Sequence, residues 1–217
     1  MTHASRLAPS LFIMALLSIA GSGTPALAAQ ELERPEDWQV RFDREGSDPS
    51  ELHFVTMTPG WHITTGPSGI LWNPSHTASG NYMLEADLHL FDPGERREAF
   101  GVFLGGGDLL EDGQAYTYFL IRRTGEFLIK GRAGADTETM VNWTAHEAIR
   151  TWPGDPDEAS VLNTLGVRME ADEAVFLVNG QEVARLGRNE VRSAGVVGLR
   201  VNHGLNLHIS RLEVSGQ

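Results

Sequence analysis

The sequence predicts an all-β protein in which two antiparallel sheets pack as a sandwich of the jelly-roll type. Short segments of alternating apolar and polar residues recur along most of the chain, and Gly, Pro, Asn or Asp separates them. They number about a dozen at a spacing of roughly ten residues, which is typical of a sandwich or barrel. No amphipathic helix longer than two turns is convincing, and the best helical candidate is 142–150.

The segment 81–91 shows the alternation most clearly. Its leucines and Ala86 alternate with Glu85, Asp87 and His89, so the two sets are expected on opposite faces of one strand. Asn179-Gly180 between two such segments is the strongest hairpin signal in the chain. The expected strands are 38–43, 52–57, 61–65, 81–91, 99–104, 114–123, 126–132, 165–170, 174–178, 181–186, 196–201 and 205–214.

Residues 1–28 have the features of a cleavable signal peptide, and 29–217 are expected to form a single β-sandwich domain. Arg6 precedes the apolar run 11–20, which is too short to span a bilayer core of about 30 Å. The small residues Ala26 and Ala28 suit positions −3 and −1 of a signal peptidase site. We therefore expect export to the bacterial periplasm or beyond, with no membrane insertion after cleavage.

Composition and charge limit the chemistry that is available. The hydrophobic fraction of 41% is that of a globular chain, and the lack of cysteine excludes disulfides, thiolate metal sites and a cysteine nucleophile. The net charge of −12 repels phosphate backbones and anionic headgroups, so no nucleic-acid or membrane-surface partner is expected. The acid excess favours a neutral or cationic partner, a divalent cation or simple solubility.

Several segments together resemble the concanavalin A-like lectin/glucanase superfamily, in particular its laminin-G-like and bacterial 3-keto-disaccharide hydrolase-like domains. The resemblance extends over about residues 80–214. It is carried by 101–106 (GVFLGG), 116–122 (YTYFLIR), 125–127 (GEF), 163–167 (NTLGV), 178–180 (VNG) and 195–201 (GVVGLRV). It implies a sugar-binding module, a glycoside hydrolase or lyase, or an adhesive domain.

Two departures from the catalytic members bear on activity. Family-16-type glucanases carry Glu, Asp and Glu on one strand, and here Glu85 and Asp87 match the first two whereas Leu90 stands at the third. The hydrolase-like family usually shows Asn, Ser and Gly before an Arg on an early strand, and 100–103 lacks this pattern.

Glu85 and Asp87 are nevertheless the candidate catalytic residues, because both project from one strand face. Their Cα atoms are expected roughly 6–7 Å apart, and a retaining glycosidase needs carboxyl groups about 5–5.5 Å apart. His89 continues this face and is a candidate proton carrier. The alternative is a solvated outer face of the sandwich, where polar alternation is the default.

Aromatic and polar residues in two irregular regions are the candidate ligand-binding residues. Sugars present flat apolar faces to aromatic rings and a rim of hydroxyls to polar side chains. The alternative is that the tryptophans fill the core or anchor loops. The candidates are Trp61, His62, Trp72, Asn73, His76, Trp143 and His146.

Two further sets of polar residues lie in a glycine-rich loop and around the last hairpin. Asp108 and Asp112 lie in a glycine-rich loop and could bind calcium, although the spacing of an EF-hand is absent; an ordinary polar loop is the alternative. Arg200, Asn206 and His208 lie around the last hairpin and are expected on a solvated strand face, since nothing in the sequence pairs with them.

The function that these features favour is an exported, non-catalytic carbohydrate-binding module for a glycan or polysaccharide. The first alternative is a glycoside-processing hydrolase that uses Glu85 and Asp87. The second is an envelope scaffold or adhesion domain without a small ligand. The sequence leaves open the sugar, the calcium requirement and the oligomeric state.

Overall fold

The computed structural model describes Met1 and residues 33–216. The predicted signal peptide therefore lies, apart from Met1, outside the described residues, and export stays a prediction. Within the described part of the chain, no helix is long and apolar enough to cross a membrane.

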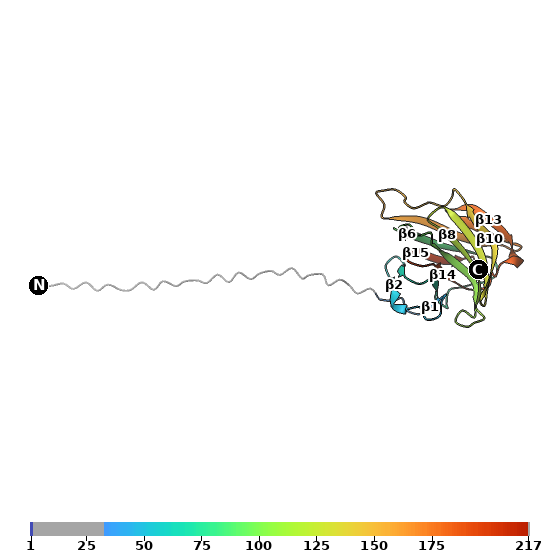
Figure 1. Cartoon of the computed structure of the whole chain (residues 1–217), viewed down its shortest axis with the longest axis horizontal. Helices are drawn as coiled ribbons and strands as arrows, with labels where there is room; N and C mark the ends of the chain where they lie inside the picture. The colour runs from blue at the N-terminus through green and yellow to red at the C-terminus, as the bar shows by residue number, and fades with distance from the viewer. Residues whose placement is uncertain (2–32, 217) are drawn as a thin grey trace. The chain divides into compact units, whose positions relative to one another are not determined.

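Residues 33–216 form two antiparallel sheets (Figure 1). The eight-stranded sheet has the order β1-β4-β14-β7-β8-β9-β10, and the short β5 (Thr77–Ala78) also pairs with β14. The bounds along this sheet are β1 Gln39–Phe42, β4 Gly69–Trp72, β14 Gly195–Val201, β7 Ala99–Gly107, β8 Ala115–Arg122, β9 Glu126–Ala133 and β10 Asp136–Ala145.

The seven-stranded sheet has the order β13-β12-β11-β6-β15-β3-β2. Its bounds are β13 Gln181–Gly187, β12 Glu173–Val178, β11 Ser160–Met169, β6 Tyr82–Phe91, β15 Leu205–Ser215, β3 Trp61–Thr65 and β2 Leu52–Thr56. Apart from the strands, the described residues contain two 3-10 turns, η1 (Pro49–Glu51) and η2 (Arg188–Glu190). The predicted two-sheet antiparallel sandwich is confirmed.

The inner faces of the two sheets form the main core. On β6, Leu84, Ala86 and Leu88 are almost completely buried, whereas the residues between them are half-buried and point outward, as the alternation predicted. Phe119 of β8 and Phe176 of β12 meet edge to face across the sandwich, with ring centroids 5.3 Å apart. This contact joins the two sheets directly.

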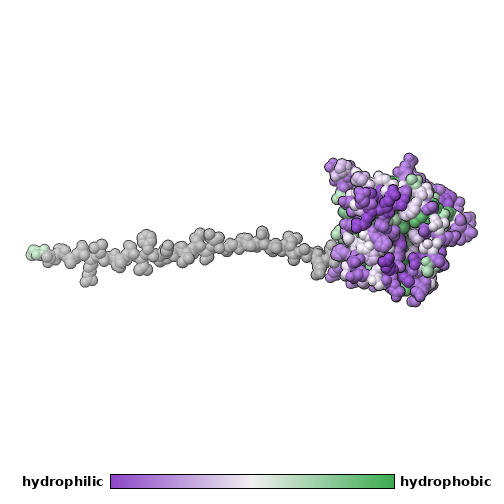
Figure 2. Space-filling model, viewed as in Figure 1, coloured by the Kyte–Doolittle hydropathy of each residue, from purple (hydrophilic) through white to green (hydrophobic). Residues whose placement is uncertain are grey.

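The outside of the domain is largely polar. Figure 2 shows a mostly hydrophilic surface on the viewed face of residues 33–216. Apart from Met1, the large apolar residues that the described structure leaves exposed are Met57 and Leu110.

The structure contains three strands that the sequence prediction lacked: β4, the two-residue β5 and β10. The stretch 142–150 is not helical, because its first half belongs to β10 and a turn follows. β10 is an edge strand whose residues are mostly exposed, so it lacks the apolar alternation that marks a strand in sequence. β4 was missed because its four residues are buried on both faces and show no alternation at all.

A buried network of amides holds the loop after β10 against the seven-stranded sheet. Asn179 has a φ of 50°, in the left-handed region, and its side-chain NH₂ donates to the carbonyl of Ala148 at 2.7 Å. Asn163 accepts from the backbone N–H of Arg150 at 2.9 Å and donates to its carbonyl at 3.0 Å. Val178-Asn179-Gly180 thus fixes a loop as well as turning a hairpin.

We expect Phe176→Ala to lower the free energy of unfolding by about 3–5 kcal/mol, because it leaves a cavity between the sheets. Phe91→Ala is the matched control, since Phe91 is half-buried on the outer face of β6, and it should cost less than half as much. Urea unfolding of both variants measures the difference. Equal losses of unfolding free energy in the two variants would show that the ring contact between the sheets adds no stability of its own.

Candidate functional site

The outer face of the eight-stranded sheet carries a second apolar cluster. An outer sheet face is ordinarily polar, and in the described residues no helix covers this one. Half-buried Trp143 and Val196 pack against the cluster. We call this surface the outer aromatic face; its buried members are Ile70, Trp72, Ala99, Phe103, Leu109, Tyr116, Tyr118, Leu120 and Leu128.

A buried ion pair lies within the outer aromatic face. Arg200 of β14 is only 8% exposed, and its two terminal nitrogens donate to the two carboxylate oxygens of Asp43, each at 2.5 Å. The guanidinium carbon lies 5.5 Å from the ring centroid of Tyr118. Ser68 also donates to Asp43, at 2.8 Å. The bidentate geometry and the added hydroxyl supply what a buried charge needs to be tolerated.

Protonation states on this face follow from burial and from these bonds. Burial raises the pKa of Asp43, but the hydrogen bonds and charge of Arg200 and the bond from Ser68 outweigh it, so the net pKa lies below its usual value. Burial raises the pKa of both Tyr116 and Tyr118. At neutral pH the carboxyl group is therefore ionised, and both phenols keep their protons.

A second arginine–carboxylate pair lies in the outer aromatic face, next to Trp143. Arg122 of β8 donates to both oxygens of Glu126, with Nε 2.7 Å from Oε2. Its guanidinium carbon lies 4.2 Å from the ring centroid of Trp143. Hydrogen bonds from Arg122 and Thr124 lower the pKa of Glu126 to about 2. Trp143 is thus stacked on a cation that is itself fixed.

The strand next to β8, β9, presents Lys130 and Arg132 on the outer side. Lys130 stands opposite Tyr118 of β8, and Arg132 stands opposite Tyr116. Arg132 donates to the carbonyl of Gly134 at 3.0 Å. In the amide orientation that satisfies both neighbours, the oxygen of Gln114 accepts from the Nε atoms of Arg132 and Arg41, each at 3.3 Å.

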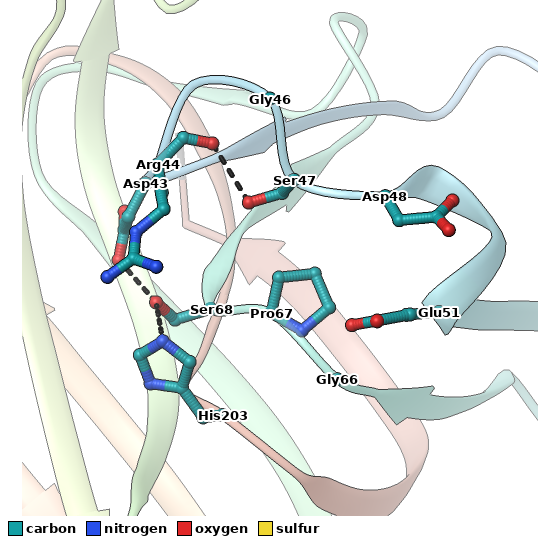
Figure 3. Close-up of a pocket in the computed structure, with 10 residues that line it drawn as sticks. All are labelled: Asp43, Arg44, Gly46, Ser47, Asp48, Glu51, Gly66, Pro67, Ser68 and His203. Carbon is teal, nitrogen blue, oxygen red and sulfur yellow. Dashed lines mark hydrogen bonds between the residues drawn. The ribbon is translucent and has the colours of Figure 1, made fainter.

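A polar cavity of about 820 Å³ opens beside Asp43 (Figure 3). Its walls come from the loop after β1, the turn between β3 and β4, and the turn before β15. Figure 3 shows Ser68 between Asp43 and His203, with Glu51 on the opposite wall near Pro67. The cavity therefore extends the outer aromatic face with polar groups.

The hydroxyl of Ser68 is not arranged as a nucleophile. It lies 3.4 Å from Nε2 of His203, whose Nδ1 is 3.8 Å from Glu98, which superficially resembles a catalytic triad. However, a serine hydroxyl has one proton, and this one goes to Asp43. His203 is then left to donate to Ser68 and does not act as its base.

Glu85 and Asp87, the predicted catalytic pair, lie on the outer face of the seven-stranded sheet. Arg211 binds both, with Nε 2.9 Å from Asp87 and Nη1 3.1 Å from Glu85, and Thr164 donates to Asp87 at 2.6 Å. Burial raises the pKa of Asp87, but the bonds from Arg211 and Thr164 outweigh it and the net pKa is lowered. Asp87 is held ionised on the sheet opposite the outer aromatic face.

The predicted ligand-binding aromatics divide between the two sheets. Trp72 and Trp143 belong to the outer aromatic face. Trp61 packs on the main core, with its ring centroid 4.8 Å from that of Trp38, and His76 meets the same Trp38 ring at 5.7 Å.

The polar candidates near these aromatics make local bonds. The side chain of Asn73 accepts from the backbone N–H of Ser75 at 2.9 Å and so closes a turn. Nδ1 of His146 accepts from the backbone N–H of Ala148 at 3.1 Å, which closes the turn after β10.

Sequence reasoning missed a row of three histidines on the outer face of the seven-stranded sheet. His208 of β15 pairs directly with His62 of β3 on one side and with His89 of β6 on the other. The ring centroids are 6.2 Å and 5.6 Å apart, respectively. Only the strand order reveals this row, because the three residues lie far apart in the chain.

The expectation of calcium at Asp108 and Asp112 gains no support from the geometry. Asp112 is fully exposed and lies 3.9 Å from Arg41, while the carbonyl of Asp108 closes a turn to Glu111. Within Met1 and residues 33–216, no group of three or more His, Asp or Glu side chains is arranged to hold a metal ion.

The burial of Arg200 was also missed, since it was expected on a solvated face. Asp43→Asn should lower the free energy of unfolding by roughly 3–5 kcal/mol, because it leaves a buried guanidinium without its counter-charge. The double variant Asp43→Leu with Arg200→Met should be closer to the wild type than the single one. Urea unfolding checks this, and a single variant as stable as the wild type would contradict it.

The histidine row predicts loss of stability in mild acid. Burial, together with the neighbouring His208, lowers the pKa of His62 and of His89 below 6.5. The unfolded chain then binds protons more readily, so stability should fall as the pH drops below about 6.5.

Unfolding in urea at pH 7.5, 6.5 and 5.5 measures this slope. The double variant His62→Gln with His89→Gln should flatten it. An unaltered slope in the double variant would refute the role of the row.

Comparisons with known proteins bear on the fold. No protein-family model and no curated protein matches this chain. Among solved structures, the carbohydrate binding module CBM66 from Bacillus subtilis is similar, with a TM-score of 0.60 and 11% identity over 83% of this chain and 96% of that one.

Two other similar structures have comparable scores. A Bacillus subtilis protein of unknown function with a galectin-like fold has a TM-score of 0.58 and 12% identity, over 82% of this chain and 88% of that one. A Bacteroides ovatus GH16 protein of the mixed-linkage glucan PUL, solved with product, has a TM-score of 0.57 and 7% identity, over 85% and 97%. At such identities the likeness shows the fold alone. The chain therefore shares the jelly-roll β-sandwich fold of these solved structures.

Proposed function

We propose that the protein is a non-catalytic glycan-binding module and that the glycan lies on the outer aromatic face. The observation that carries this proposal is the set of aromatic and donor groups fixed on that face. Trp143 of β10 offers a half-buried ring that packs on the same cluster as Tyr118, and Lys130 and Arg132 follow along the outer side of the neighbouring strand β9. One sugar unit of a glycan stacks on the ring, and further units bond to the two cations through their hydroxyls.

The two arginine–carboxylate pairs support binding by a prepared surface. Arg122 is fixed by Glu126 below Trp143, and Arg200 is fixed by Asp43 beside Tyr118. Side chains that are already ordered lose little entropy when a ligand arrives. The carbohydrate binding module and the GH16 protein named above have the same fold, which is consistent with a glycan ligand here.

The protonation of the carboxyl groups favours binding over glycoside hydrolysis. A hydrolase of the usual kind needs one carboxylic acid that keeps its proton near neutral pH. Hydrogen bonds hold the pKa of Asp43, Glu126 and Asp87 below the ordinary value, and each of these carboxylates is paired with an arginine.

Trp143→Ala tests the proposal. It removes the stacking surface, so the affinity for a bound oligosaccharide should fall about tenfold or more. A thermal-shift screen of neutral and acidic oligosaccharides first identifies the ligand, which must raise the melting temperature of the wild type. Isothermal titration calorimetry then compares the variants.

Trp152→Ala is the control, because that tryptophan packs against the main core. It should lower stability and leave the affinity within about twofold of the wild type. Unchanged affinity in Trp143→Ala, or no melting shift with any oligosaccharide, would contradict binding at this face and favour the scaffold alternative.

A further inference from the structure

The charge of the outer aromatic face is opposite to that of the whole chain. The chain carries a net charge of −12, from which a neutral or cationic partner was expected. On the outer side of β1, β8, β9 and β14, however, basic groups outnumber acidic ones. The basic side chains are Arg41, Arg122, Lys130, Arg132 and Arg200, and the carboxylates are Asp43 and Glu126.

Both carboxylates are already engaged by two of these arginines, Arg200 and Arg122. Arg41 bonds to two backbone carbonyls and lies 3.9 Å from a fully exposed aspartate, Asp112. In the described part of the chain, no carboxylate forms an ion pair with Lys130 or Arg132. Neither cation is therefore in direct contact with a carboxylate, although the charge of Arg132 acts on Asp43 from a distance.

On the seven-stranded sheet, by contrast, arginines are paired with carboxylates. Arg168 pairs with Glu170 at 2.7 Å, and Arg185 pairs with both Glu173 and Glu182. Arg211 likewise bridges two carboxylates. The excess of positive charge is thus a property of one face, and it is not explained by a general shortage of acidic partners.

Lys130 and Arg132 are also placed to act together. They lie two residues apart on one side of β9, so their Cα atoms are separated by roughly 6–7 Å. The side chains of both are donors only, and the phenols of Tyr116 and Tyr118 opposite them keep their protons because burial raises their pKa. A ligand with several acceptor oxygens and a negative charge satisfies such a set.

We propose that the glycan bound on the outer aromatic face is anionic, and that its acid group lies between Lys130 and Arg132. This inference rests on the proposed function and adds the substrate class to it. The acid group is the carboxylate of a uronate residue or the sulfate of a sulfated sugar, since both offer several oxygens that share one or more negative charges.

Four oligosaccharide probes separate these possibilities in calorimetric titrations of the protein. They are an oligogalacturonide, its carboxyl-reduced neutral form, a sulfated galactan oligosaccharide without uronate (a carrageenan oligosaccharide) and its desulfated neutral form. We expect one acidic probe to bind at least about tenfold more tightly than its own neutral form. The neutral form lacks the acid group and therefore the charge-assisted hydrogen bonds that the acid group makes. Which acidic probe binds identifies the acid group. Raising the salt concentration should weaken that binding.

Lys130→Gln and Arg132→Gln each remove one cation. Each should lower the affinity for the acidic probe about tenfold or more. Among the described residues, the side chain of Lys130 forms no hydrogen bond. Lys130→Gln should therefore fold normally, which thermal unfolding verifies. Arg168→Gln removes an equal charge from the other sheet and is the matched control, with an expected change below about twofold.

The failures of the two proposals are distinguishable. If neutral and acidic probes bind equally well, and Lys130→Gln has no effect while Trp143→Ala does, the anionic class is overturned and the glycan site stands. If none of the four probes binds to the wild type and the wider oligosaccharide screen also shows no melting shift, both proposals are overturned.

Discussion

The buried ion pair between Arg200 and Asp43 is the interaction on which the outer face of the eight-stranded sheet depends. A buried guanidinium near the end of β14 would be very costly without a counter-charge. Asp43 comes from just beyond the end of β1, and Ser68 from the turn before β4 holds its second oxygen. The pair therefore ties an edge strand and a turn to the centre of the sheet, and it places a charge beside the Tyr118 ring.

The two outer faces of the sandwich are consequently different surfaces. The seven-stranded sheet presents paired charges around Arg211 and a row of histidines centred on His208, which is a solvated face with a pH-dependent element. The eight-stranded sheet presents rings, arginines held by carboxylates, and cations that lack a carboxylate. A prepared, donor-rich surface of that kind is typical of a ligand site, whereas the arginines of the other face are paired with carboxylates.

The fold could be predicted from the sequence because the two-residue period is strong wherever one strand face is buried and the other exposed, as in β6. The same rule failed for β4, which is buried on both faces, and for β10, which is a mostly exposed edge strand. Periodicity is absent in both situations, so the pattern could not identify them.

The candidate site was much less predictable. Trp72 and Trp143 were selected for their type and for their place in irregular regions, whereas both lie in strands. The ion pairs beside them depend on contacts between residues far apart in the chain. Asp43 and Arg200 are 157 positions apart, and the net charge of the chain concealed a local excess of the opposite sign. A local clue was present, since a lone arginine between apolar residues of β14 must find a partner if both strand faces are buried. The partner itself could be found only from the strand order.

The most direct test of this account is an NMR titration that follows the indole N–H signals of the five tryptophans while an acidic oligosaccharide is added. The account predicts that the Trp143 signal shifts with saturation, while those of Trp61 and Trp152 stay in place because their rings pack on the main core. Amide signals of β9 around Lys130 should shift with the same affinity. Saturable shifts confined to the histidine row around His208, with Trp143 unaffected, would contradict the assignment of the ligand site to the eight-stranded sheet.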